Sequence, residues 1–118
     1  MTFDPYGFEK RLKLRPVARL VKEDGYEGEH FAVWRDENEH LYYGSGSHCS
    51  CNEPFDNVKA LSDLKPAKDF NEVWRGARAW QDDNSGVKAD EVTAFRGALL
   101  EALAEIRKAH QKSYWTEV

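Results

Sequence analysis

The sequence predicts an α+β fold in which a small antiparallel sheet packs against C-terminal helices. Two observations carry this prediction. Residues 30–43 hold aromatic and β-branched side chains on either side of a polar break, which is typical of a β-hairpin. Residues 89–111 carry apolar side chains at helical spacing, which is typical of a long amphipathic helix.

The composition predicts one soluble domain. The chain has 118 residues, a size typical of a single domain, so we expect residues 1–118 to fold as one unit. Hydrophobic residues make up 41%, enough for one core, and charged residues make up 32%, which suits a soluble surface. No apolar run approaches the roughly 20 residues that cross a bilayer. Two cysteines are too few for a secreted disulfide scaffold, so we expect a cytoplasmic protein without membrane association.

The first strand of the hairpin is the clearest strand in the chain. Phe31 and Val33 fall on one of its faces, whereas Ala32 and Trp34 fall on the other. Because both faces are apolar, we expect the hairpin to be covered on its second side too, by helix. The two glycines of Gly44–Ser47 predict that the second strand ends there, since glycine permits unusual backbone angles and close approach.

Shorter elements are expected around the hairpin. Residues 8–13 predict a helical turn, residues 17–21 a first strand, and residues 58–64 a short helix. Residues 69–80 fit a helix and a strand, and we favour the helix because their apolar positions recur at helical spacing.

The long C-terminal helix carries more apolar surface than one face needs. Its stripe comprises Val92, Phe95, Leu99, Leu103, Ile106 and His110. Leu100 widens that stripe, which predicts contact with a second surface, either more of the same domain or a partner helix. We therefore name Leu99, Leu100 and Leu103 as candidate interaction residues.

Charge is distributed unevenly along the chain. Residues 9–22 hold six basic side chains against Glu9 alone, a local charge of +5, which leaves −9 for the rest of a chain whose net charge is −4. Such a strip can contact phosphate or an acidic partner, through Lys10, Arg11 and Lys13 above all, but we favour a solvated strand and turn. An acidic isoelectric point and the lack of a nucleic-acid-binding motif argue against nucleic acid as the partner.

The most distinctive residue types lie in the segment after the hairpin, where His48, Cys49 and Cys51 follow one another closely. Imidazole and thiolate are the usual zinc ligands, but structural zinc normally needs two Cys-x₂₋₄-Cys pairs, and this chain has one Cys-x-Cys. A fourth ligand would have to come from one of a few other side chains, namely His30, His40, His110 or Glu53.

Two other interpretations of this segment stay open. A cysteine in a Gly-Ser loop beside a histidine suits thiol chemistry, although no Cys-His-Asn pattern supports a catalytic nucleophile. Alternatively, Cys49 and Cys51 fill space at the end of the hairpin, since free cysteines are more often buried than reactive. Of the metal, thiol and packing roles, the sequence favours packing.

The same segment also carries a resemblance. The matching residues are Val33-Trp34-Arg35-Asp36, Tyr42-Tyr43, Cys49-Ser50-Cys51, Pro54-Phe55-Asp56 and Leu61-Ser62-Asp63-Leu64. In this combination residues 26–66 resemble a family of small uncharacterised proteins encoded by bacteriophages of actinobacteria. The chain departs from that pattern at His48, where glycine is usual, and at Asn52, where proline is usual. The resemblance implies a phage origin and expression in the host cytoplasm, and it implies no activity.

These observations lead to one functional expectation and its alternatives. We expect a non-enzymatic phage accessory protein, of a host-takeover or anti-defence type, that binds a host or phage macromolecule. Self-association through the C-terminal helix is one form of such binding. The alternatives are a metal- or thiol-dependent protein that uses His48, Cys49 and Cys51, with zinc as the implied metal, and a weak nucleic-acid binder that uses residues 9–22.

Overall fold

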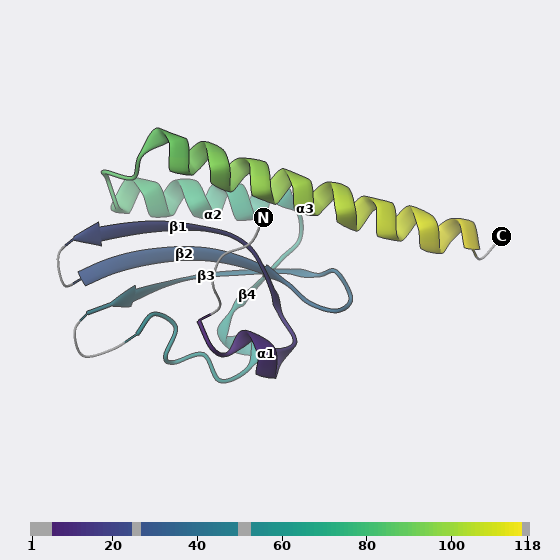
Figure 1. The fold of residues 1–118 in the computed structure, drawn as a ribbon, viewed down its shortest axis with the longest axis horizontal. Helices are drawn as coiled ribbons and strands as arrows, with labels where there is room; N and C mark the ends of the chain where they lie inside the picture. Colours follow the sequence, from purple (N-terminus) through teal and green to yellow (C-terminus); the bar gives the residue numbers. More distant parts are fainter. Residues whose placement is uncertain (1–5, 25–26, 50–52, 117–118) are drawn as a thin grey trace.

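The computed structural model describes residues 6–24, 27–49 and 53–116. Its strands form one antiparallel sheet in the order β1-β2-β3-β4. Two long helices, α2 and α3, cover one face of this sheet, and the short helix α1 lies on the other (Figure 1). The α+β prediction is thereby confirmed. The elements in chain order are α1 (Glu9–Leu12), β1 (Arg15–Asp24), β2 (Glu27–Arg35), β3 (Leu41–His48), a 3₁₀ turn (Leu61–Asp63), β4 (Lys65–Ala67), α2 (Phe70–Asp83) and α3 (Ala89–Thr116).

The inner strand β2 is buried on both faces, as its alternation predicts. Phe31 and Val33 join the core beneath α2 and α3. Ala32 and Trp34, both 0% exposed, join a second core on the opposite face. The cover on that second face differs from the helix we expected, because it combines α1 with the largely irregular segment 53–64.

Strand β3 continues beyond the point where the sequence predicts its end. It pairs with β2 as far as His48, which lies opposite Gly28. The glycines in β3 serve close approach rather than a turn. A Cβ added at Gly46 would lie 3.1 Å from the main-chain nitrogen of Phe55, whose ring packs across the strand. The strand therefore ends four residues later than expected from Gly44.

The expected helix over residues 58–64 is replaced by a single 3₁₀ turn and the short strand β4. The Asp63 carboxylate accepts the N–H groups of Lys59 and Ala60 at 2.8 and 3.1 Å, an arrangement typical of the start of a turn. The chain then enters β4, where Pro66 is tolerated because β4 is the last strand of the sheet. A strand of three residues leaves no period to detect in the sequence.

Helix α2 confirms the helical interpretation of residues 69–80. The Asp69 side chain caps it by accepting the main-chain N–H of Glu72 at 3.0 Å. Its buried residues, Val73, Ala77 and Trp80, recur at helical spacing and face the sheet. The helix packs across β2 and β4.

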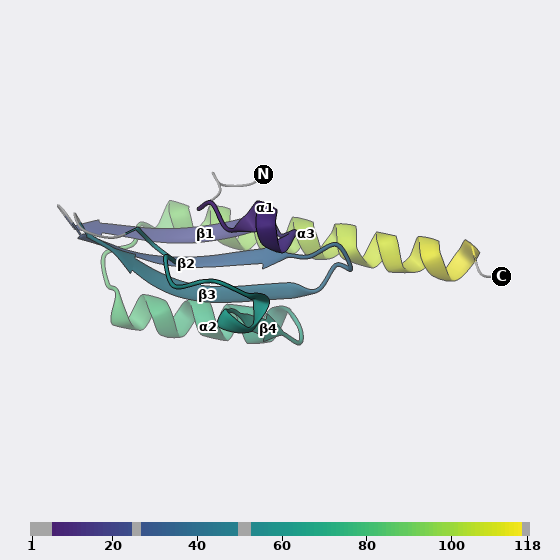
Figure 2. The same ribbon diagram turned by 90° about the horizontal axis from the view of Figure 1, so that it is seen from below.

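Helix α3 lies over β1 and extends beyond the sheet (Figure 2). Its 28 residues span about 42 Å at 1.5 Å per residue, whereas the ten residues of β1 span about 33 Å. The helix buries Phe95, Leu99, Ala102 and Ile106 against the sheet. None of the helices in the described ranges is both long enough and apolar enough to cross a membrane.

Two adjacent leucines in α3 provide a matched test of this packing. Leu99 is 0% exposed, whereas Leu100 is 41% exposed. We expect Leu99→Ala to lower the free energy of unfolding by about 3 kcal/mol, since it leaves a cavity in the core. Leu100→Ala should cost less than about 0.5 kcal/mol, because the exposed isopropyl group that it removes fills no space in the core. Urea unfolding measures both values, and equal losses would contradict the packing of α3.

Candidate functional site

The predicted site residue His48 lies at the end of β3, beside another histidine. Gly28 faces His48 across the sheet and His30 faces Gly46, so the two imidazoles are diagonal neighbours. His30 Nε2 and His48 Nδ1 are hydrogen-bonded at 2.8 Å. The His48 ring lies directly over Gly28, where an added Cβ would overlap it. Glycine at position 28 therefore makes room for the histidine pair.

A tyrosine extends this pair into a chain of three polar groups. The Tyr6 hydroxyl and His30 Nδ1 are hydrogen-bonded at 2.8 Å. Burial, followed by the nearby charges of His48 and Arg19, lowers the pKa of His30 to about 4. His30 is therefore neutral at pH 7, with one ring nitrogen donating and the other accepting. Burial also raises the pKa of Tyr6, which keeps its proton at neutral pH.

A buried carboxylate holds Tyr6 in place. Glu9 is 2% exposed, and its oxygens accept the main-chain N–H groups of Tyr6 and Gly7 at 2.8 to 2.9 Å. They also accept the indole N–H of Trp34 at 3.1 Å. Three donors from two segments satisfy this carboxylate, which makes its burial tolerable. Glu9 therefore ties Tyr6 and Gly7 to β2.

The structure describes only part of the segment for which a metal or thiol role was considered. Cys49 is half-buried next to His48, and Cys51 lies outside the described residues. Of the side chains considered as a further ligand, His30 is beside His48, whereas His40 lies at the other end of the hairpin. In the described part of the chain, no three His, Cys, Asp or Glu side chains gather closely enough to hold a metal ion.

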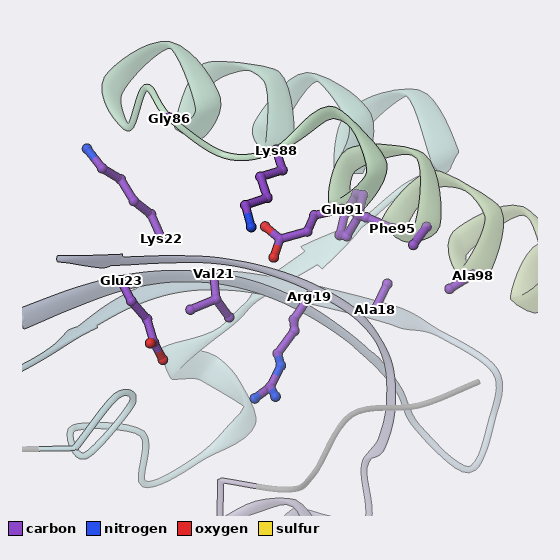
Figure 3. Close-up of a pocket in the computed structure, with 11 residues that line it drawn as sticks. Ala18, Arg19, Val21, Lys22, Glu23, Gly86, Lys88, Glu91, Phe95 and Ala98 are labelled. Atoms are coloured by element: carbon purple, nitrogen blue, oxygen red, sulfur yellow. The ribbon is translucent and has the colours of Figure 1, made fainter. Parts of the chain in front are cut away.

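A second feature, not anticipated from the sequence, is a groove between β1 and α3 (Figure 3). Its volume is about 750 Å³. We call it the β1–α3 groove, and its lining residues are Ala18, Arg19, Val21, Lys22, Glu23, Gly86, Lys88, Glu91, Ala94, Phe95 and Ala98.

Strand β1 forms one side of this groove. Ala18 and Lys22 point toward α3, whereas Arg19 and Glu23 point to the opposite side of the sheet (Figure 3). Arg19 and Glu23 nevertheless line the groove, so they contribute mainly their backbone and the base of their side chains. Because β1 is the first strand of the sheet, its outer N–H and C=O groups have no neighbouring strand within the described sheet.

The helix side of the groove combines small, apolar and charged residues. Ala94 and Ala98 leave room on α3, and the ring of Phe95 lies deeper, at 2% exposure. Lys22 and Lys88 lie on opposite sides of the opening, Lys22 on β1 and Lys88 directly before α3 (Figure 3). Neither lysine forms an ion pair within residues 6–24, 27–49 and 53–109, so both ammonium groups can meet an anionic ligand.

The leucines predicted as interaction residues fall in three different environments. Leu99 is wholly buried in the chain's own core, which removes it from any surface open to a partner. Leu103 is half-buried and packs against that core. Leu100 alone of the three is exposed. The surplus apolar surface inferred from the stripe is therefore accounted for largely by contact within the domain.

The predicted basic residues are on and beside α1. Arg11 is engaged, since its guanidinium donates to the carbonyls of Lys59 and Val58 at 2.7 and 3.3 Å. Lys10 and Lys13 are exposed. The structure thus leaves two of these three side chains open to solvent, and uses the third to fasten α1 to the segment before β4.

Comparison with known proteins shows the family. A family model described as "Domain of unknown function (DUF7574)" matches residues 4–110. The chain belongs to this family. No curated protein and no solved structure matches it. The matched range includes both the histidine pair and the β1–α3 groove, so the family relationship favours neither as the functional site.

The lowered pKa of His30 predicts a pH-dependent stability. Unfolded histidine titrates near pH 6.5, so between about pH 6.5 and pH 4 the unfolded chain binds a proton that the folded chain does not. The free energy of unfolding should fall by about 2–3 kcal/mol on this account as the pH drops through that window. When the free energy of unfolding is measured in urea at several pH values, His30→Gln should reduce its dependence on pH. The exposed His40→Gln serves as control, and equal slopes in both variants would contradict the burial of His30.

Proposed function

We propose that this protein is a non-enzymatic bacteriophage accessory protein, of a host-takeover or anti-defence type. It acts in the host cytoplasm and binds a host or phage protein through the β1–α3 groove. The resemblance of residues 26–66 to actinobacteriophage proteins supports the phage origin.

The β1–α3 groove is the observation that carries the binding role. Its volume of about 750 Å³ falls within the range of about 300–1,000 Å³ that is typical of ligand sites. It combines an apolar floor at Phe95 with the end strand β1 and the ammonium groups of Lys22 and Lys88. Apolar surface beside a few polar groups is the usual character of a recognition site.

The partner is a protein because the groove offers main-chain groups along a strand. An edge strand is a ready template for pairing with another polypeptide. Strand β1 runs from Arg15 to Asp24, and five of its residues line the groove. A small molecule would use the volume of the groove but would leave much of this edge unpaired.

A second candidate function is a metal- or thiol-dependent protein that uses His48, Cys49 and Cys51. The observation in its favour is the contact between His48 and His30, which brings a second imidazole to the motif. Two imidazoles and a thiolate suit zinc. To bind a metal between the two rings, the hydrogen bond of 2.8 Å between His30 Nε2 and His48 Nδ1 would have to open.

Site-specific photo-crosslinking in host cells tests the binding role. With p-benzoylphenylalanine in place of Ala94, we expect one discrete covalent adduct on a denaturing gel, because position 94 lines the groove. The same substitution at Ala104, which is exposed on α3 outside the groove, should give no adduct. Adding Lys22→Glu and Lys88→Glu to the position-94 variant should reduce the adduct. No adduct, or equal adducts at both positions, would overturn this function.

Elemental analysis distinguishes the second candidate. Structural zinc binds tightly and stoichiometrically, so a protein with such a site retains about one equivalent through purification. We expect protein purified without a metal-affinity tag to contain less than about a tenth of an equivalent of zinc. Near one equivalent in the protein, lost in His48→Ala and retained in His40→Ala, would instead establish a metal site at the histidine pair.

A further inference from the structure

We propose that the β1–α3 groove binds an extended segment of the partner, which pairs with β1 as a fifth strand and places an acidic side chain between Lys22 and Lys88. This inference rests on the proposed function and specifies how the partner is recognised.

The hydrogen-bonding edge of β1 is the first argument. Pairing between β1 and β2 is irregular between Pro16 and Ala18, and it is regular from Ala18 to Asp24. A regular strand directs alternate N–H and C=O groups to its outer side at a constant repeat. The regular stretch is the part of β1 that lines the groove. An added strand of about six residues would match it over about 20 Å.

The position of α3 is the second argument, because it provides a surface for side chains of the added strand. Alternate side chains of a strand point to opposite faces, so every second one would point toward α3. There it would meet the open space beside Ala94 and Ala98, with Phe95 beneath. Main-chain bonds then provide affinity, and this space selects an apolar side chain of moderate size.

The charges at the opening are the third argument. Lys22 on β1 and Lys88 before α3 both border the groove, and neither has an anionic partner in the described ranges. They complement a carboxylate in the bound segment. Glu91 also lines the groove, one helical turn from Lys88, and would repel a second carboxylate placed farther along α3. The preferred segment therefore carries one acidic residue at the Lys88 end rather than an acidic run.

The geometry favours an extended segment over a helix. A helix is about 10–12 Å wide and satisfies its own main-chain groups, so it would leave the outer edge of β1 unpaired. An extended chain presents the complementary N–H and C=O groups at the spacing of β1 itself.

Selection from a displayed library of random ten-residue peptides tests this inference. We expect enriched sequences that alternate β-branched or aromatic residues with polar ones and carry a single Asp or Glu. Hydrogen exchange measured with a selected synthetic peptide should show new protection of main-chain amides within residues 18–24. Substitution of N-methylated residues at alternate positions of that peptide should abolish binding, because it removes the main-chain donors.

Variants of the protein make the test specific. The double substitution Lys22→Glu and Lys88→Glu should lower the affinity for the acidic peptide about tenfold. A peptide with Lys in place of its acidic residue should bind this double variant more tightly than it binds the original protein. Ala94→Trp should weaken binding more than tenfold by filling the groove, whereas the exposed Ala104→Trp should have no effect. The two lysine substitutions lie at the surface opening, so they remain informative if Ala94→Trp fails to fold.

Three outcomes would overturn the inference whatever the crosslinking result. The first is a selection that enriches no groove-binding peptide. The second is protection on elements other than β1. The third is a protein that dimerises in light scattering with its β1 amides already protected, which would make a second copy the occupant of the edge. A discrete crosslink from position 94 together with unprotected β1 amides would retain the binding function and reject strand addition.

Discussion

The burial of β2 on both faces is the constraint on which the rest of the structure depends. An antiparallel sheet often leaves one face to water, but Phe31 and Val33 on one side and Ala32 and Trp34 on the other are all buried. The chain must therefore supply two covers. The C-terminal helices provide one, and α1 with segment 53–64 provides the other.

The second cover explains why polar side chains gather near His48. Irregular chain packed on a sheet brings main-chain N–H groups into the interior, and these need acceptors. The Glu9 carboxylate supplies them for Tyr6 and Gly7, and it also accepts the indole N–H of Trp34. Tyr6 in turn bonds His30, which bonds His48. Each of these groups has a structural partner, and together they hold Tyr6 and Gly7 against the hairpin.

The first cover has a different consequence. Helix α3 lies over β1, an end strand, so the helix and the strand border the groove from two sides. Alanines at positions 94 and 98 keep the helix side open, while Phe95 on the same helix closes the core below. One helix thereby seals the interior and leaves an open groove at the edge of the sheet.

The sequence by itself determined the elements whose signals are local. The alternation in residues 30–35 and the helical spacing in residues 69–80 and 89–111 each depend on near neighbours, and each corresponds to an observed element. Only the tertiary structure decided that β3 continues to His48, that Leu99 is buried while Leu100 is exposed, and that His30 meets His48. It also decided that β1 and α3, far apart in the chain, enclose a groove. The reason is physical. The periodicity of apolar residues indicates which side of a helix or strand is apolar. Contacts between distant segments depend instead on how the helices and the segment 53–64 pack on the two faces of β2.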